Sequence, residues 1–172
     1  MKNNILITGS NGFIGTHLCD LLSKDLNINL WILKTKKNKK KTKYNYIEIE
    51  DLKSNFDITE KLKKIDCIIH LAALAHNKYK KNEIFEVNVN SVIRLANQAS
   101  QAKVKKFIFL STIKVYGEFS PNNTIFNEES PTYPQTIYAK AKLDAEKYLL
   151  DLSKISDLKI TIIRSPLVYG KN

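Results

Sequence analysis

A tyrosine and a lysine four residues apart, Tyr138 and Lys142, are the side chains of this sequence best suited to moving a proton. On a helix, side chains at this spacing lie on one face. A nearby ammonium group stabilises a phenolate, so Tyr138 could exchange a proton with a substrate hydroxyl near neutral pH. In a chain with eight tyrosines and 26 lysines such a pair also arises by chance, so its place along the chain decides its meaning.

The position of the pair supports a catalytic role. The apolar run at 107–111 predicts a strand that ends in Ser111 and is followed by Thr112, which places two hydroxyls at the carboxyl edge of a sheet. A long loop at 117–134 follows, with three prolines, and loops of this length are usually functional. The helix predicted at 137–152 follows, with the tyrosine as its second residue. Ligands of parallel sheets bind at this edge, so Thr112 and the pair are expected to lie together.

Three glycines form a second candidate site near the N-terminus. The chain has only five glycines, yet Gly9, Gly12 and Gly15 fall within seven residues of one another. They lie between an apolar run at 5–8 and a helical pattern at 13–24, where backbone can approach a pyrophosphate and a helix N-terminus supplies N–H donors. This context favours a dinucleotide site over an incidental turn, although the spacing is G-x-x-G-x-x-G and not G-x-G-x-x-G.

Short β-branched runs alternate with helical patterns along the rest of the chain. Such alternation predicts βαβ units with right-handed crossovers. We expect an α/β fold of the Rossmann type, a doubly wound parallel sheet with helices on both faces, in one domain over residues 1–172. The predicted strands are 5–8, 28–33, 44–49, 67–71, 107–111 and 159–163, and the predicted helices are 13–24, 58–64, 82–102 and 137–152.

The composition disfavours several classes of protein. The net charge is +11, but arginine, the residue suited to bidentate phosphate and guanine contacts, occurs only twice. The seven lysines between Lys34 and Lys43 are expected to form a solvated loop and not a nucleic-acid arm.

Two cysteines cannot form a disulfide framework, and no metal-ligand spacing surrounds them, so no metal is expected. The sequence shows neither an apolar run of membrane length nor a signal peptide, which predicts a cytoplasmic protein without membrane contact.

Short motifs spread over the whole chain point to one family. They are TGSNGFIG (8–15), Asp51-Leu52, HLAA (70–73), NVNS (88–91), LSTIKVYG (110–117), YAKAK (138–142) and RSPLVYG (164–170). Together and in this order they resemble the extended short-chain dehydrogenase/reductases, and within them the NAD-dependent epimerase/dehydratase family that modifies nucleotide sugars. The resemblance implies a nicotinamide cofactor, NAD or NADP, and a nucleotide-sugar substrate, with UDP as the expected nucleotide.

The resemblance also implies a role for each residue that matches a motif. Thr112, Tyr138 and Lys142 would be catalytic, with Tyr138 as the acid and base and Lys142 holding the nicotinamide ribose and lowering the tyrosine pKa. His70 is expected to be a packed residue at a strand end, whereas His76 could face the sugar or the solvent. The remaining cofactor residues would be Gly9, Asn11, Gly12, Phe13, Ile14 and Gly15 at the pyrophosphate, Asp51 and Leu52 at the adenine, Leu71, Ala72 and Ala73 along the cofactor with Asn88 behind them, Ser111 beside Thr112, and Pro166 over the nicotinamide.

Two departures from the family pattern bear on the cofactor and the reaction. NAD-binding members carry an acidic residue at the end of the second strand, where it accepts hydrogen bonds from the adenosine ribose. This chain has Lys34 there, which could neutralise a 2′-phosphate, so NADP stays open beside NAD. Sugar-nucleotide 4,6-dehydratases follow the catalytic threonine with Asp-Glu, whereas Ile113-Lys114 follow Thr112 here. This difference disfavours a dehydratase.

The expected reaction is hydride transfer at the sugar C4, as in a UDP-hexose 4-epimerase. The alternatives are a 4-keto-sugar-nucleotide reductase and a non-catalytic NAD(P)-binding or interaction module. Family members that turn over nucleotide sugars are about twice as long, and their C-terminal half builds much of the sugar pocket. We therefore expect residues 1–172 to be the cofactor domain without its substrate domain, weak or inactive as an enzyme alone, with a homodimer as a further expectation.

Overall fold

The computed structural model describes residues 2–38, 41–75, 79–120 and 125–170, and His76 lies outside these ranges. Strands and helices alternate as predicted, with two short turns of other helical types, η1 and η2. In chain order the elements are β1 (Asn3–Thr8), α1 (Phe13–Leu22), β2 (Ile28–Thr35), β3 (Asn45–Ile49), α2 (Thr59–Leu62), β4 (Cys67–His70), α3 (Lys81–Phe85), η1 (Glu86–Asn90), α4 (Ser91–Gln101), β5 (Lys106–Thr112), η2 (Ile113–Tyr116), α5 (Ile137–Ile155) and β6 (Lys159–Ser165).

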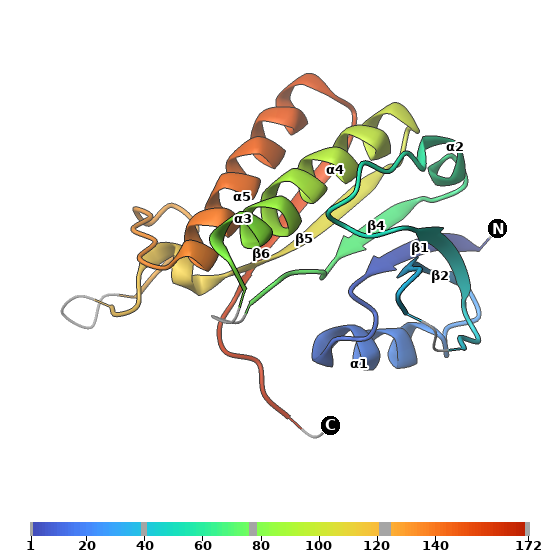
Figure 1. Ribbon diagram of the computed structural model, residues 1–172, viewed down its shortest axis with the longest axis horizontal. Helices are drawn as coiled ribbons and strands as arrows, with labels where there is room; N and C mark the ends of the chain where they lie inside the picture. The colour runs from blue at the N-terminus through green and yellow to red at the C-terminus, as the bar shows by residue number, and fades with distance from the viewer. Residues whose placement is uncertain (1, 39–40, 76–78, 121–124, 171–172) are drawn as a thin grey trace.

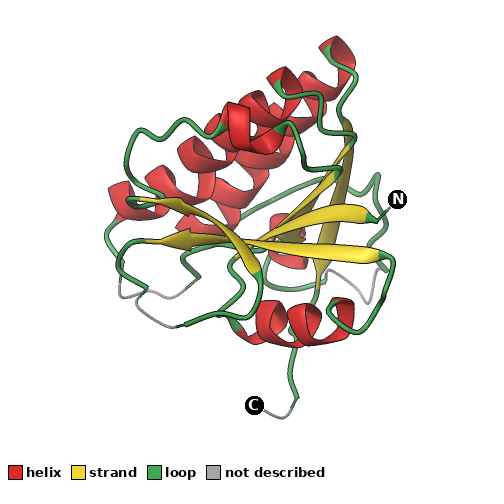
Figure 2. Cartoon of the chain, turned by 90° about the vertical axis from the view of Figure 1, so that its right-hand side faces the viewer, coloured by secondary structure: helices red, strands yellow, loops and turns green. Residues whose placement is uncertain are grey.

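The strands form one parallel sheet in the order β3-β2-β1-β4-β5-β6. The chain reverses its direction of winding between β1 and β4, and this is the switch point at which such sheets bind ligands. Figure 1 shows α3, α4 and α5 on one face of the sheet and α1 on the other, and Figure 2 shows the two helix layers from the side. The predicted Rossmann-type, doubly wound sheet with helices on both faces is confirmed.

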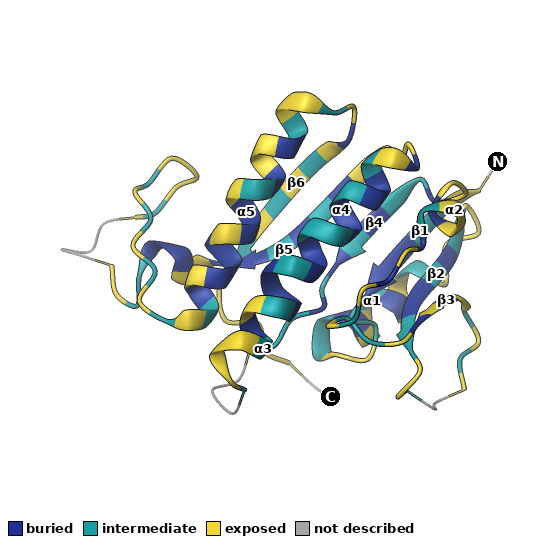
Figure 3. Ribbon diagram, turned by 45° about the horizontal axis from the view of Figure 1, so that its top comes forward, coloured by how far each residue is buried: buried dark blue, intermediate teal, exposed yellow. Residues whose placement is uncertain are grey.

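Alternating side chains of the strands fill apolar cores on the two faces of the sheet. The larger core lies against α4 and α5 and contains Leu95, Phe107 and Leu149, each fully buried. The smaller core lies against α1 and contains Ile7 and Cys19. Figure 3 shows buried residues on the inner sides of the helices and exposed residues on their outer sides. Removal of these apolar side chains from water is the main favourable contribution to folding.

The helix predicted over 82–102 is interrupted. The structure has α3, then the five residues of η1 with π-helical hydrogen bonding, then α4. Within this segment the hydroxyl of Ser91 donates a hydrogen bond to the carbonyl oxygen of Val87 at 2.6 Å. A π-helical turn holds one residue more than an α-helical turn and occurs frequently at functional sites. The apolar pattern predicts a helix here but not the change of register, because both sides of the break are helical.

The helix α5 carries the tyrosine and lysine of the predicted catalytic pair. It begins after Thr136, whose hydroxyl oxygen accepts a hydrogen bond from the N–H of Ala139 at 3.1 Å and so caps the helix. The hydroxyl of Tyr148 ties α5 to α4 by donating to Asn97 Oδ1 at 2.7 Å. No helix among the described residues combines the length and the apolar character needed to cross a bilayer.

Candidate active site

The glycine turn between β1 and α1 is too tight for side chains. Gly9 has a φ of +71°, in the left-handed region that favours glycine, and a Cβ there would lie 2.7 Å from the backbone nitrogen of Ala72. A Cβ on Gly15 would overlap the carbonyl oxygen of Gly9, to which the N–H of Gly12 donates a hydrogen bond at 3.0 Å. The turn therefore packs closely against the end of β4 and against the first turn of α1.

A small cavity of about 140 Å³ lies against this turn, and we call it the turn cavity. Gly12, which lines it, is also the N-cap residue of α1, and no side chain caps this helix. Uncapped N–H groups and the positive end of the helix dipole suit an anion such as a pyrophosphate. The structure brings five of the predicted cofactor residues together around this cavity, namely Gly9, Asn11, Gly12, Leu52 and Ala72.

Thr8, the first residue of the TGSNGFIG motif but one without a predicted role, joins β1 to the segment after β4. Its hydroxyl oxygen accepts a hydrogen bond from the N–H of Ala72 at 3.2 Å and lies 3.0 Å from Nδ1 of His70. His70 is fully buried and stacks near the rings of Phe107 and Phe109. Burial lowers the pKa of His70 to about 3, so the imidazole is neutral near pH 7 and serves packing, as predicted. The signal for Thr8 was its place as the polar residue that ends an apolar strand.

Asn88, another predicted cofactor residue, braces the segment that follows β4. From η1 its side-chain oxygen accepts a hydrogen bond from the N–H of Leu74 at 2.8 Å, and its side-chain nitrogen donates to the carbonyl oxygen of Leu74 at 3.0 Å. Asn88 is only 1% exposed, so its amide is committed to this pair of bonds. It therefore holds the backbone two residues after Ala72, which lines the turn cavity.

Thr112, Tyr138 and Lys142 lie where β5 and η2 contact α5. Lys142 is 2% exposed, and its Nζ lies 3.8 Å from the ring centroid of Phe109, three residues before Thr112 on β5. Tyr138 is partly buried and lies one helical turn before Lys142. The Oγ1 of Thr112 accepts a hydrogen bond from the N–H of Lys114 at 3.3 Å and so begins η2. All three predicted catalytic residues therefore belong to the carboxyl edge of the sheet or to the helix packed against it.

Burial shifts the pKa values of Tyr138 and Lys142. It lowers the pKa of Lys142 to about 7, and the nearby carboxylate of Glu146 offsets part of this effect. Burial raises the pKa of Tyr138. The lowering of the tyrosine pKa expected from Lys142 is therefore not found, because the lysine amino group lies over the Phe109 ring and its own charge is disfavoured by burial. The phenol of Tyr138 is protonated at neutral pH and can donate its proton.

Glu146 is a residue of this site that sequence reasoning missed. It lies one turn after Lys142 on α5 and is 0% exposed. Its carboxylate accepts hydrogen bonds from the hydroxyl of Ser111 and from Arg164, with Nη2 at 2.7 Å and Nε at 3.1 Å. Arg164 also donates to the hydroxyl of Tyr116 at 2.6 Å. This network joins β5, β6 and α5 beside the catalytic residues, and the only sequence signal for it was an arginine in a chain that has just two.

Other predicted residues lie apart from the turn cavity. The hydroxyl of Ser111 is engaged by Glu146. Asp51 accepts hydrogen bonds from Lys37 Nζ at 3.1 Å and from the N–H of Lys53 at 3.0 Å, as a turn residue does. Their contacts with a cofactor stay predictions. The structure places Phe13 and Ile14 in the first turn of α1, Leu71 and Ala73 just after β4, Pro166 exposed after β6, and Lys34 in a neighbouring cavity.

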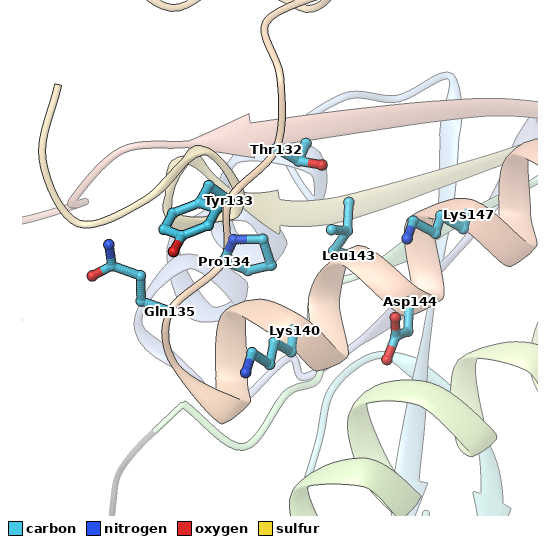
Figure 4. Close-up of a pocket in the computed structure, with 8 residues that line it drawn as sticks. All are labelled: Thr132, Tyr133, Pro134, Gln135, Lys140, Leu143, Asp144 and Lys147. Carbon is cyan, nitrogen blue, oxygen red and sulfur yellow. The ribbon is translucent and has the colours of Figure 1, made fainter. Parts of the chain in front are cut away.

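A larger cavity on the outer side of α5 is not part of this site. It measures about 630 Å³ and lies between α5 and the segment 132–135 (Figure 4). The helix residues that line it occupy the side of α5 away from Tyr138 and Lys142. They are Lys140, Leu143, Asp144 and Lys147.

Lys142→Met is expected to raise the free energy of unfolding at pH 7 by roughly 2 kcal/mol, because it replaces a buried amino group with an apolar chain of similar length. The pKa of Lys142 is about 7 in the folded chain, against a model value of 10.5. Between these values the unfolded chain holds a proton that the folded chain lacks, so stability should rise with pH from about 7 to about 10.5.

Urea denaturation at pH 7 and pH 9 measures this effect. Lys142→Met should lose that part of the pH dependence, whereas the control Lys140→Met, on the exposed side of the same helix, should keep it. Equal pH dependence in the two variants would contradict the low pKa of Lys142.

Comparison with known proteins gives the site a context. The sequence pattern of the NAD dependent epimerase/dehydratase family matches residues 5–172. The UDP-glucose 4-epimerase of Vibrio cholerae is 35% identical over 177 residues, which cover 99% of this chain and 53% of that protein. The dTDP-D-glucose 4,6-dehydratase of Homo sapiens is 32% identical over 183 residues, which cover 96% of this chain and 50% of that protein. The chain therefore spans about half the length of these curated relatives.

A solved structure extends the likeness to the fold. The UDP-glucuronic acid 4-epimerase from Bacillus cereus, in complex with NAD, has a TM-score of 0.83 at 28% identity and covers 97% of this chain and 58% of its own. The same enzyme in complex with UDP-glucuronic acid and NAD has a TM-score of 0.79 at 27% identity and covers 94% of this chain and 55% of its own. The shared part is the sheet with its flanking helices, which is the part that positions the candidate site here.

Proposed function

The chain belongs to the NAD dependent epimerase/dehydratase family, and we propose that it binds a nicotinamide dinucleotide across the glycine turn and transfers hydride at C4 of a UDP-linked sugar. The reaction would be that of a nucleotide-sugar 4-epimerase. The Vibrio cholerae relative is named for this reaction on UDP-glucose, and the Bacillus cereus enzyme was solved with UDP-glucuronic acid and NAD. These names favour a UDP nucleotide for the substrate.

One observation carries the proposal, namely the burial of Lys142 on the face of α5 that also holds Tyr138. A buried lysine is costly for a fold unless its charge or its donors are used. Strongly shifted pKa values gather at functional sites, and an amino group with a pKa of about 7 beside a tyrosine suits proton transfer near neutral pH. The pair lies at the sheet edge where ligands of parallel sheets bind.

In the proposed reaction, Tyr138, Lys142 and Thr112 would each have a separate role. A bound NAD or NADP would supply the acceptor and donor of hydride. Tyr138 would accept the proton of the sugar 4-hydroxyl when it is in its phenolate form, and would later return that proton. Because burial raises the pKa of Tyr138, forming the phenolate requires nearby positive charge, which Lys142 in its protonated form would supply. Thr112 would donate a hydrogen bond to the sugar oxygen and hold it near Tyr138.

A 4,6-dehydratase is not proposed, although the human relative carries that name. Elimination of water needs an acid and a base in addition to the hydride step. Ile113 and Lys114 follow Thr112, and the Nζ of Lys114 pairs with Glu118 at 3.0 Å. Neither of these two positions supplies a carboxylate.

Tyr138→Phe tests the proposed function. It is expected to slow formation of reduced nicotinamide after addition of UDP-glucose or UDP-galactose by on the order of 10²- to 10⁴-fold, because it removes the group that moves the proton. Nicotinamide fluorescence measures the rate, and a binding titration should show that cofactor affinity is nearly unchanged. The matched control is Tyr148→Phe, which removes a hydroxyl from the same helix where it bonds Asn97.

The outcomes separate the alternatives. Equal rates for Tyr138→Phe and Tyr148→Phe would contradict the role of Tyr138. Net and irreversible consumption of reduced cofactor with a 4-keto sugar nucleotide, without epimerisation, would favour a reductase. Cofactor binding without any hydride exchange, under conditions where the sugar nucleotide is shown to bind, would favour a non-catalytic binding module. We also propose that residues 1–172 act as one dinucleotide-binding domain, which the same titration tests.

A further inference from the structure

A second cavity adjoins the turn cavity on the side of α1, and we call it the lysine cavity. It measures about 340 Å³ and lies between α1, the end of β2 and the segment 41–44. Ser10, Asn11 and Asn38 line both cavities, so the two share a border at the glycine turn. A ligand seated in the turn cavity would extend past these residues into the lysine cavity.

The lysine cavity is positively charged. Lys34, Lys41 and Lys43 line it, against the single carboxylate of Asp20. Asp20 lies 4.0 Å from the Nζ of Lys43 and accepts a hydrogen bond from the hydroxyl of Tyr44 at 3.3 Å. The charge of this carboxylate is therefore offset by Lys43, and Lys34 and Lys41 leave an excess of positive charge.

The sequence predicts that the lysines between Lys34 and Lys43 form one solvated loop, but those that the structure describes differ in their surroundings. Lys36 and Lys37 do not line the cavity, and they pair with Glu50 at 2.5 Å and with Asp51 at 3.1 Å. Lys34, in contrast, lies at the end of β2, with its Nζ 5.2 Å from the ring centroid of Tyr46. Of the three lysines that line the cavity, only Lys43 has a carboxylate partner there, whereas Lys36 and Lys37 pair with carboxylates outside it.

The end of β2 is where a dinucleotide site of this kind distinguishes NAD from NADP. An acidic side chain there accepts hydrogen bonds from the ribose hydroxyls, whereas a basic side chain accommodates a 2′-phosphate. An ammonium group has three donors and no acceptor, so Lys34 can bind a phosphate oxygen but cannot accept a bond from a ribose hydroxyl. The nearby acid Asp51 is held by Lys37 and does not line either cavity.

We propose that the lysine cavity binds the 2′-phosphate of NADP and that this chain therefore prefers NADP to NAD. The inference rests on the proposed function, because it requires a dinucleotide to lie across the glycine turn. The Bacillus cereus relative was solved with NAD, so the preference would distinguish this chain from that enzyme.

Titration calorimetry of the 172-residue chain with NAD⁺ and NADP⁺ tests the proposal. Two smaller probes, 5′-AMP and adenosine 2′,5′-bisphosphate, differ only in the 2′-phosphate. We expect NADP⁺ to bind at least about tenfold more tightly than NAD⁺, because a hydrogen bond between charged groups contributes that ratio or more. Lys34→Asp should abolish this preference. The control Lys24→Asp makes the same change of charge at an exposed residue outside the cavity and should keep the preference.

Each result has one meaning. Equal or tighter binding of NAD⁺ by the unaltered chain overturns the 2′-phosphate site and leaves the proposed function standing. A preference for NADP⁺ that survives Lys34→Asp also overturns it, since the phosphate would then be bound elsewhere. Failure of all four compounds to bind contradicts the proposed function itself, and the 2′-phosphate site with it.

Discussion

Replacing Glu146 with leucine is expected to lower the free energy of unfolding by about 3 to 5 kcal/mol. The carboxylate is fully buried, while the side chain of Arg164 is 20% exposed. Removing the acid leaves the guanidinium largely buried without its partner, and removes the acceptor of the Ser111 hydroxyl. Loss of one partner of a buried pair costs more than the pair itself contributes, because the remaining charge stays desolvated.

A double-mutant cycle in urea denaturation separates this cost from a simple packing defect. Glu146→Leu and Arg164→Met should each be strongly destabilising, and the double variant should lose clearly less than the two single losses together. Glu146→Gln, which keeps the shape and can still accept from Ser111, should lose less than Glu146→Leu. Additive losses in the cycle would show that the two side chains do not depend on each other.

Gly15→Ala is expected to destabilise the fold by about 3 kcal/mol or more and to abolish dinucleotide binding. The added methyl group would overlap the carbonyl oxygen of Gly9 and lie 2.8 Å from the Cα of Ser10. Both are backbone atoms, so the overlap can be relieved only by opening the turn. Opening it would move Gly12, the N-cap residue of α1, and with it the N–H groups that we expect to face the pyrophosphate.

A second variant keeps this prediction testable if Gly15→Ala does not fold. Gly12→Ala places a methyl group 3.3 Å from the carbonyl oxygen of Gly9, which requires a shift of only a few tenths of an ångström. It should fold with a small loss of stability and weaker dinucleotide binding. Thermal unfolding and a binding titration measure both effects. A Gly15→Ala chain as stable as the unaltered chain would contradict the close contact in the turn.

The sheet was predictable because its signals are local. Each predicted strand is a short apolar run, and the chain alternates these runs with helical patterns, which leaves few possible topologies. The glycine turn was predictable for the same reason, since Gly9 and Gly15 lie only six residues apart in sequence and the turn needs both. The turn cavity accordingly contains residues that the motifs named, such as Asn11 and Ala72.

The parts that were not predicted depend on residues far apart in the sequence. Glu146 meets Ser111 and Arg164 across separations of 35 and 18 residues, and no local pattern relates them. The pKa values were also beyond sequence reasoning. The spacing of Tyr138 and Lys142 predicts that one charge stabilises the other, whereas burial determines both pKa values in the fold.

The π-helical segment η1 has a consequence for the length of the chain. Without its extra residue, α3 and α4 would form one continuous α-helix, and the residues on one side of the join would turn by about 100° around the axis. Asn88 would then lose the backbone of Leu74, which it holds by two hydrogen bonds. Between β4 and β5 the site therefore constrains the number of residues as well as their types.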